Sequence, residues 1–165
     1  LASGSWSPEI ALRMNLRIPI QAAKGYSVTL ENPPVTPKLP LLFSEARVVV
    51  NPLGYALRIA GTLELAGLDF SLNLRRVRAM QRSSTHYLPG VAKANVIEIW
   101  RGLRPCTPDG LPIISRVKNF DNLIVAAGHA MLGMSLGPIT GKLVSQMVKE
   151  ERSELNIAPL AANRF

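Results

Sequence analysis

The spacing of apolar residues predicts a series of short elements at the start of the chain. A short buried strand is predicted at residues 1–5, followed by a helix with Pro8 in its first turn that reaches about Met14. A second strand is predicted over residues 18–30. The four prolines within residues 31–40 then predict an extended loop, because proline fixes φ and removes a backbone donor.

The middle of the chain predicts a hairpin, a long helix and another strand. The runs 47–50 and 55–61 flank the turn sequence Asn-Pro-Leu-Gly, and the second run alternates with the period of two of a half-buried strand. Asp69 is expected to cap a helix over residues 70–87, which has apolar residues at helical spacing and arginines opposite them. Residues 95–103 alternate again and predict a strand.

The last third predicts a shaped loop, a buried strand and a helix. Prolines and a glycine restrict the backbone over residues 104–115, whereas the apolar run 123–127 is typical of a strand buried on both faces. A glycine-rich turn leads to a helix over residues 137–150, and the last fifteen residues are expected to form a loose tail. The predicted fold class is α+β, with a mixed, mostly antiparallel sheet and a closing strand and helix that resemble part of a nucleotide-binding layer.

Composition and charge narrow the classes of protein. A hydrophobic fraction of 47% with 18% charged residues indicates a folded chain, and no stretch approaches the roughly 20 apolar residues of a membrane-spanning helix. The net charge of +8 is compatible with nucleic acid, an anionic membrane or an acidic ligand. The arginines of the helix predicted at 70–87 lack the interleaved aromatic residues of a base-stacking surface, so no nucleic acid is expected. A solvated helix face is the simpler interpretation, and contact with lipid headgroups is the alternative.

Cysteine and histidine are sparse. The single Cys106 cannot form an internal disulfide, so a cytoplasmic setting is expected. His86 and His129 are far apart, and no Cys or His cluster has the spacing of metal ligands, so no metal site is predicted. A lone histidine at a strand-to-turn edge is more often structural than a general base. The motifs Gly-x-Ser-x-Gly and Gly-x-x-x-x-Gly-Lys are missing, which disfavours hydrolase and phosphate-transfer chemistry.

Two segments carry candidate chemistry. In residues 100–112, a strand on one side and a proline on the other would hold the backbone of Arg104, whose guanidinium can then grip a carboxylate with two parallel hydrogen bonds. A surface arginine at a strand end is the alternative. In residues 126–141, Ser135 is a candidate cap and Pro138 fits a first helical turn, which predicts a helix N-terminus suited to an anion. Glycines spaced four apart also suit tight helix packing.

Four motifs occur in order along nearly the whole chain. They are Gly-x-Trp-Ser at residues 4–7, Lys-Gly-Tyr-Ser at 24–27, Gly-x-Arg-Pro-x-Thr-Pro-Asp-Gly-x-Pro at 102–112 and Gly-His-x-x-x-Gly at 128–133. Together they resemble the C-terminal part of the D-amino-acid oxidase superfamily of FAD-dependent oxidoreductases, which includes glycine oxidase, sarcosine oxidase and bacterial D-amino-acid dehydrogenases. The Lys-Gly-Tyr-Ser and Thr-Pro-Asp-Gly variants look closest to the dehydrogenases.

The resemblance implies a division of the chain between two domains. Residues 1–17 would end an FAD-binding Rossmann-like domain, 18–103 would form the substrate-binding sheet, 104–150 would return to the FAD-binding domain, and 151–165 would be a C-terminal tail. The family's Gly-x-Gly-x-x-Gly and its acidic ribose ligand do not occur in this sequence. The implied partner is therefore the N-terminal half of the FAD-binding domain, and this fragment alone is expected to be inactive.

The resemblance also implies where substrate and FAD bind. Arg104 would bind the substrate carboxylate. The residues implied to line the flavin are Trp6, Gly128, His129, Ala130, Met131, Leu132, Gly133, Met134 and Ser135. The sequence departs from glycine oxidase-like members at two places: Met131 replaces a second arginine, and valines at 48–49 replace a tyrosine, for which Tyr26 or Tyr55 is the candidate substitute.

The activity implied by the resemblance is FAD-dependent oxidative deamination of an amino acid, with a D-amino acid as the expected substrate. Hydride would pass from the substrate α-carbon to the flavin, water would release a keto acid and ammonia, and no catalytic protein base is obligatory. Oxygen or a membrane quinone would accept the electrons, and peripheral binding to the inner membrane is compatible with the cytoplasmic setting. The alternatives are a glycine or sarcosine oxidase-type amine oxidase and a non-catalytic basic module docking on a membrane or acidic partner.

Overall fold

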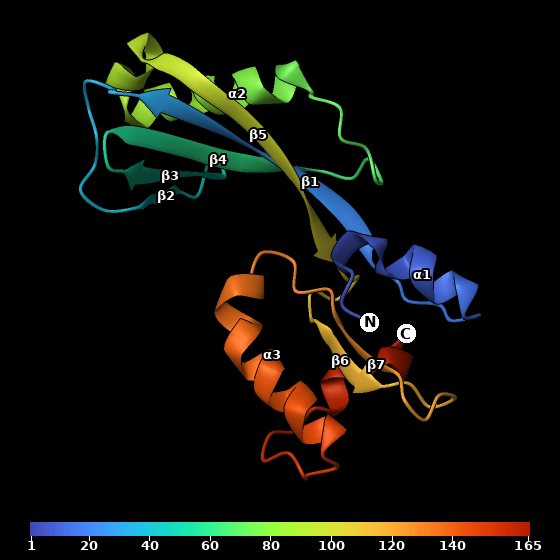
Figure 1. Cartoon of the computed structure of the whole chain (residues 1–165). Coiled ribbons are helices and arrows are strands. Elements are labelled where there is room, and N and C mark those ends of the chain that lie inside the picture. Colours follow the sequence, from blue (N-terminus) through green and yellow to red (C-terminus); the bar gives the residue numbers. More distant parts are fainter. The chain divides into compact units, whose positions relative to one another are not determined.

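The computed structural model describes all 165 residues and divides them into two compact units. Unit 1 comprises residues 1–23 and 103–165, and unit 2 comprises residues 24–102. The chain passes from unit 1 to unit 2 within β1 (Gln21–Glu31) and returns within β5 (Asn95–Cys106) (Figure 1). Each unit has its own cluster of buried apolar side chains, so each is described by itself.

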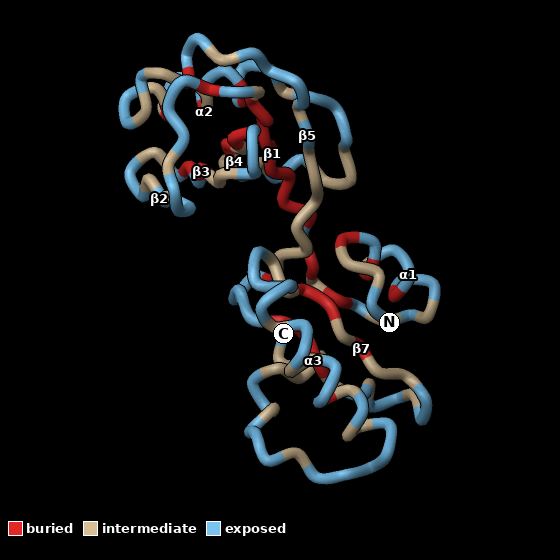
Figure 2. The backbone as a smooth tube through the Cα atoms, turned by 60° about the vertical axis from the view of Figure 1, so that its left-hand side comes forward, coloured by how far each residue is buried: buried red, intermediate tan, exposed pale blue.

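Unit 2 is built on a five-stranded sheet with the strand order β2-β3-β4-β1-β5. The remaining strands are β2 (Leu41–Phe43), β3 (Val48–Leu53) and β4 (Ala56–Glu64). The predicted hairpin is confirmed, because β3 and β4 pair antiparallel with Val50 opposite Ile59. Ile59 also lies opposite Val28 of β1, the strand whose central residues are all buried (Figure 2).

The helix α2 (Leu74–Tyr87) covers one face of this sheet (Figure 1). Its buried Val77 and Met80 pack into the core cluster with the inward side chains of the strands. The helix begins four residues later than the sequence predicts, with Asn73 rather than Asp69 at its N-cap. The reason is that the Asp69 carboxylate binds the buried ammonium of Lys24 instead.

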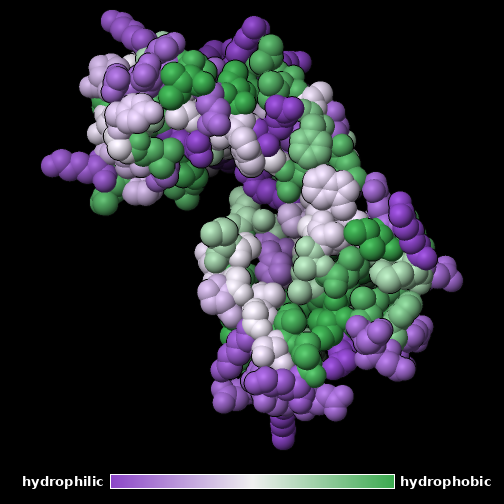
Figure 3. Space-filling model, viewed as in Figure 1, coloured by the Kyte–Doolittle hydropathy of each residue, from purple (hydrophilic) through white to green (hydrophobic).

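Unit 1 combines a two-stranded antiparallel sheet with the long helix α3 and several short helices. Its elements are η1 (Gly4–Trp6), α1 (Ser7–Arg13), β6 (Ile113–Arg116), β7 (Ile124–Ala127), α3 (Gly133–Val148), η3 (Ala158–Leu160) and η4 (Ala162–Arg164). The core contains Ala11, Ile18, Ile113 and Val125. In the view of Figure 3, apolar residues gather on the face of unit 1 that carries β6 and β7.

The structure differs from the sequence-based expectation at the start of unit 1 and in its loops. Where a strand is predicted at residues 1–5, only Leu1 pairs with β7, its carbonyl accepting a hydrogen bond from the Ala126 amide at 3.0 Å. Residues 4–6 turn into a 3-10 helix instead, with Gly4 at φ +56°. The loop predicted over residues 104–115 contains the end of β5 and the start of β6.

The C-terminal elements also differ. The helix predicted from residue 137 begins at Gly133, so Ser135 is not its cap and Pro138 lies inside the helix rather than in its first turn. The N-cap is Leu132, whose side chain makes no capping hydrogen bond. Where a loose tail is predicted, the Ala162 amide donates to the Ser115 hydroxyl of β6 at 2.8 Å. The predicted fold class is confirmed, whereas these element boundaries are not.

Candidate functional site

Two segments that are distant in sequence meet in unit 1. One is the end of β5 at residues 104–107, and the other is the turn at residues 128–130 that follows β7. Cys106 and His129 form an antiparallel bridge, and the Ala130 amide donates to the Pro105 carbonyl at 3.0 Å. We call these two segments together the strand–turn junction. It brings the candidate carboxylate-binding strand and the candidate flavin-lining turn to one place.

The backbone of the turn explains why glycine stands at residue 128. Gly128 has φ +84°, in the left-handed region that favours glycine, and an added Cβ would lie 2.7 Å from the Thr107 methyl carbon. Ala130 is also left-handed, with φ +47°, a conformation that costs a residue with a Cβ about 1–2 kcal/mol. The surrounding hydrogen bonds therefore hold a tight, strained turn directly against the end of β5.

Arg104 lies on β5, two residues before the bridge to His129, and is half-buried. Its charge reaches the neighbouring thiol: burial raises the pKa of Cys106, and the positive charge of Arg104 opposes that rise. The raised pKa keeps the thiol protonated at neutral pH, which does not favour a nucleophilic role. On the other side, the Ser5 hydroxyl donates to the Leu103 carbonyl at 3.4 Å and so places η1, with the partly exposed Trp6, beside this strand.

The His129 ring joins the turn to the helix that follows it. Its Nε2 lies 2.9 Å from the Thr140 hydroxyl on α3. Burial lowers the pKa of His129 below its ordinary value of 6.5, because desolvation disfavours the charged imidazolium. The ring is therefore neutral at pH 7 and connects α3 to the strand–turn junction.

The N-terminus of α3 carries exposed apolar side chains and free backbone donors. Met131 is 75% exposed and Met134 is 94% exposed. The first-turn amides of α3 have no acceptor within the helix, and no side chain caps them. An added Cβ at Gly137 or Gly141 would meet nothing within 4 Å, so these glycines do not serve tight packing within the chain. The backbone of α3 is therefore exposed at these two glycines.

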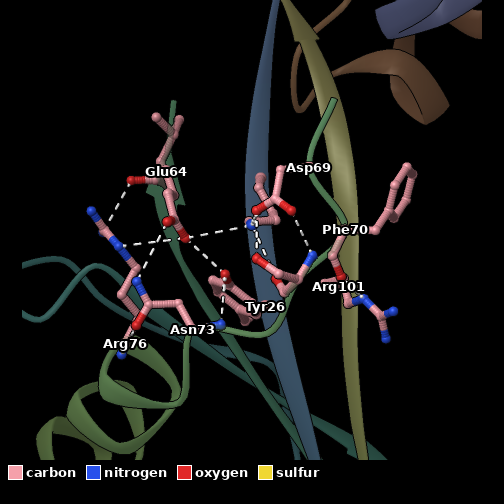
Figure 4. Close-up of polar contacts among 10 residues, drawn as sticks. Tyr26, Glu64, Asp69, Phe70, Asn73, Arg76 and Arg101 are labelled. Carbon is pink, nitrogen blue, oxygen red and sulfur yellow. Dashed lines mark hydrogen bonds and ion pairs between the residues drawn. The ribbon is translucent and has the colours of Figure 1, made fainter. Parts of the chain in front are cut away.

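In unit 2, the buried Lys24 belongs to a polar cluster, of which Figure 4 labels Tyr26, Glu64 and Asp69. Its Nζ donates to Asp69 Oδ2 at 2.5 Å and to the Ser71 carbonyl at 3.0 Å, and it lies 4.0 Å from Glu64 Oε2. The bond to Asp69 raises the pKa of Lys24 and holds the pKa of Asp69 well below its usual range. The ammonium is thus charged, and its partners fasten the segment around residue 70 to β1.

Tyr26, a candidate substrate residue, points into the same cluster. Its hydroxyl donates to Glu64 at 2.7 Å and accepts from the Asn73 amide at 3.2 Å, and Figure 4 shows these groups facing one another. The bond from Tyr26 lowers the pKa of Glu64. The hydroxyl thus already has a donor and an acceptor within unit 2, and a role in substrate binding stays a prediction.

The second candidate tyrosine is distant from the first. Tyr55 is exposed in the turn before β4, and its carbonyl accepts from the Asn32 amide. Tyr26 lies on β1 opposite Gly61, six residues before Asn32, which directly follows the strand. Six residues of strand span about 20 Å, so the two tyrosines do not form one site. The role of Tyr55 also stays a prediction.

Sequence reasoning missed the ion pairs, among them Lys24 with Asp69 and Arg164 with Asp109. Their partners are 45 and 55 residues apart, so no local pattern indicates them. One signal was present: Lys24 lies inside the strand predicted over residues 18–30, and a lysine that such a strand buries requires a partner.

Comparison with known proteins places these features in a family. A family model described as FAD dependent oxidoreductase matches residues 1–147. A D-amino-acid oxidase of Bradyrhizobium diazoefficiens is 33% identical over all of this chain and 40% of its own length. A D-amino acid dehydrogenase of Xanthobacter autotrophicus is 32% identical over 99% of this chain and 39% of its own length. The chain therefore spans about 40% of the curated relatives that it matches.

Among solved structures, a glycine oxidase from Geobacillus kaustophilus has a TM-score of 0.90 and 29% identity, covering 99% of this chain and 44% of its own. An iminodiacetate oxidase from Chelativorans sp. BNC1 has a TM-score of 0.88 and 25% identity, covering 97% and 44%. No helix in this structure has both the length and the hydropathy needed to span a bilayer.

Replacing Tyr26 by Phe tests the polar cluster. Removing the hydroxyl leaves the Asn73 backbone amide without its acceptor and takes from Glu64 the shorter of its two side-chain hydrogen bonds, so we expect a loss of about 1–3 kcal/mol in the free energy of unfolding. Denaturant titration of the variant and the wild type measures it. An unchanged free energy would contradict the structural role, and a separate rise in KM for an amino acid would support the substrate role.

His129 generates a prediction about pH. Because its pKa is lower in the folded than in the unfolded state, its contribution to stability is complete above pH 6.5 and is lost as the pH falls further. His129→Gln retains a hydrogen-bonding side chain without the titration. The melting temperature of the wild type should therefore fall more between pH 7.5 and 5.5 than that of the variant. Equal falls would rule out this linkage.

Proposed function

The chain belongs to the family of FAD dependent oxidoreductases, and from that premise we propose that the intact protein oxidises an amino acid, with this chain supplying the carboxylate clamp and one wall of the flavin site. The observation that carries the proposal is the strand–turn junction. Arg104 is on the strand that bridges directly to residues 128–130. A substrate carboxylate bound by the arginine would thus be fixed relative to the turn by two short stretches of backbone.

The residues present fit FAD at the N-terminus of α3. The uncapped first turn offers backbone amides and the positive end of the helix dipole, which suit the electron-rich edge of a reduced flavin. The glycines of α3 would let a flat ring approach the helix backbone, and the exposed Met134 would add apolar contact. We assign residues 128–135, with Trp6 from η1, to this wall. Bound FAD would supply the acceptor for the hydride of the substrate.

Arg104 would contribute binding and orientation. A guanidinium holds a carboxylate through two parallel hydrogen bonds, which fixes the direction of the α-carbon. The residue at 131 is methionine rather than a second cation, so the clamp has a single arginine. We assign no catalytic acid or base: His129 is neutral and engaged with Thr140, and the Cys106 thiol is protonated. Oxidation then depends on placing the substrate rather than on a protein base.

The substrate that we propose is a D-amino acid, as the names of the two sequence relatives suggest. Glycine or a secondary amine such as sarcosine is the alternative, favoured by the likeness to a glycine oxidase. In this scheme, unit 1 contributes both Arg104 and one wall of the flavin site. The electron acceptor would be oxygen or a membrane quinone.

One observation favours a second candidate function, docking of a basic module on an anionic membrane or an acidic partner. The helix α2 contains no acidic residue, and Arg75, Arg78 and Arg82 are exposed on it. In Figure 3, hydrophilic side chains project from the surface around this helix. Binding of the protein to anionic vesicles that weakens with salt would support this function, and it is compatible with an oxidoreductase.

The full-length protein tests the proposed activity. We expect it to carry flavin absorbance that bleaches when a D-amino acid is added without oxygen. The ranking of kcat/KM for D-alanine, glycine and sarcosine then identifies the substrate class, and oxygen compared with a quinone analogue identifies the acceptor. A colourless protein, or a flavin that no amino acid or amine reduces, would contradict the proposal.

Arg104→Leu tests the clamp. Losing two charge-assisted hydrogen bonds weakens binding by about 2–3 kcal/mol, so KM for the amino acid should rise roughly 30- to 150-fold while flavin content is unchanged. Arg104→Lys keeps the positive charge but cannot form two parallel hydrogen bonds, so its KM should lie between those of the wild type and Arg104→Leu. Arg13→Leu on the exposed end of α1 is the matched control. An unchanged KM in the Arg104→Leu variant would refute the clamp.

A further inference from the structure

The C-terminal segment, residues 157–165, is fastened to the turn that follows β5. Arg164 forms a two-pronged ion pair with Asp109, with Nε 2.7 Å from Oδ2 and Nη2 3.0 Å from Oδ1. Nη2 also donates to the Leu111 carbonyl at 2.7 Å. Only 13% of the Arg164 side chain is exposed. Pairs of this geometry and burial are stronger than ordinary surface ion pairs.

The arginine is itself held in place. Its Nη1 donates to the Ala161 carbonyl at 3.0 Å, and its guanidinium lies 4.4 Å from the centre of the Phe165 ring. The Ala162 amide donates to the Ser115 hydroxyl on β6. The segment is therefore anchored to the sheet of unit 1, and these contacts fix the orientation of the Arg164 guanidinium.

The turn at residues 107–112 connects this anchor to the strand–turn junction. Within it, the Thr107 hydroxyl donates to the Leu111 carbonyl at 2.7 Å, and the Leu111 amide donates to Asp109 Oδ1 at 3.1 Å. The buried Thr107 also places its methyl group where a side chain at Gly128 would lie. One side of the turn thus touches the arginine, and the other side touches residue 128.

We propose that Arg164 is a positioning residue for the site. By gripping Asp109 and Leu111, it keeps Thr107 against Gly128 and so keeps the end of β5, with Arg104, in register with the turn at 128–130. The functional part of this inference rests on the proposed function, because it assumes that Arg104 binds the substrate carboxylate. A purely local role, in which Arg164 only attaches the tail, makes different predictions.

Amide-resolved hydrogen exchange in the full-length protein separates the two roles. In Arg164→Gln, we expect exchange at least about tenfold faster at Leu111, whose acceptor is Asp109, and also at Ala130, whose acceptor is the Pro105 carbonyl. Arg152→Gln, which changes an exposed arginine that precedes this segment in unit 1, should change neither. Faster exchange at Leu111 with Ala130 unchanged, or no change at either amide, would overturn the proposal.

Kinetics provide the second readout. Arg164→Gln should raise KM for the amino acid about three- to tenfold with kcat within about twofold, while KM for the corresponding amino-acid amide, which lacks the carboxylate, stays constant. Asp109→Asn should raise KM for the amino acid by a similar factor. The double variant should raise it no further, because both substitutions remove the same ion pair between Arg164 and Asp109. If Arg164→Gln does not fold, the same comparison of KM for the acid and the amide is made with Arg164→Lys and Asp109→Asn. Equal rises for the acid and the amide would overturn the positioning role.

Failure of the proposed function would look different. If the wild-type protein oxidises no amino acid, the kinetic readout is lost, but the exchange rates at Leu111 and Ala130 still decide whether Arg164 controls the junction.

Discussion

The close approach of Thr107 to Gly128 is the contact on which the candidate site depends. A methyl group occupies the space of a missing side chain, and the left-handed backbone at Gly128 turns the chain so that the Ala130 amide reaches the Pro105 carbonyl. The fit between Thr107 and Gly128 is therefore steric and does not depend on charge. Because the strand that carries Arg104 and the turn that leads into α3 share this contact, neither can shift without the other.

Two of the long-range ion pairs, Lys24 with Asp69 and Arg164 with Asp109, form by the same local arrangement in the two units. In each, an aspartate accepts a hydrogen bond from the amide two residues later, and a distant cation binds both that aspartate and the carbonyl of the same later residue. Lys24 does this at Asp69, and Arg164 does it at Asp109. The aspartate shapes its own turn, and the cation fastens the finished turn to a distant part of the fold. Each of these two loops is thereby ordered without regular secondary structure.

Elements with clear periodicity could be predicted from the sequence, and those shaped by distant partners could not. The hairpin of β3 and β4 was predictable because its alternation and turn chemistry are local. The start of α2 was not, because Asp69 is an equally good cap by sequence but is bound by Lys24. The four motifs in their order indicated the family. Their spacing could not show that residues 104–107 and 128–130 meet, because the β-bridge between Cys106 and His129 joins segments that β6 and β7 separate in the sequence.

The most direct test of the junction is Gly128→Ala in the full-length protein, measured as flavin content and as the affinity of the remaining holoenzyme for a simple carboxylate ligand. The added Cβ collides with the Thr107 methyl group, so we predict that both quantities fall together. Adding Thr107→Ser removes that methyl group, keeps the hydroxyl, and should partly restore both. A loss of flavin with unchanged carboxylate affinity, or the reverse, would contradict the account that the two sites share one element.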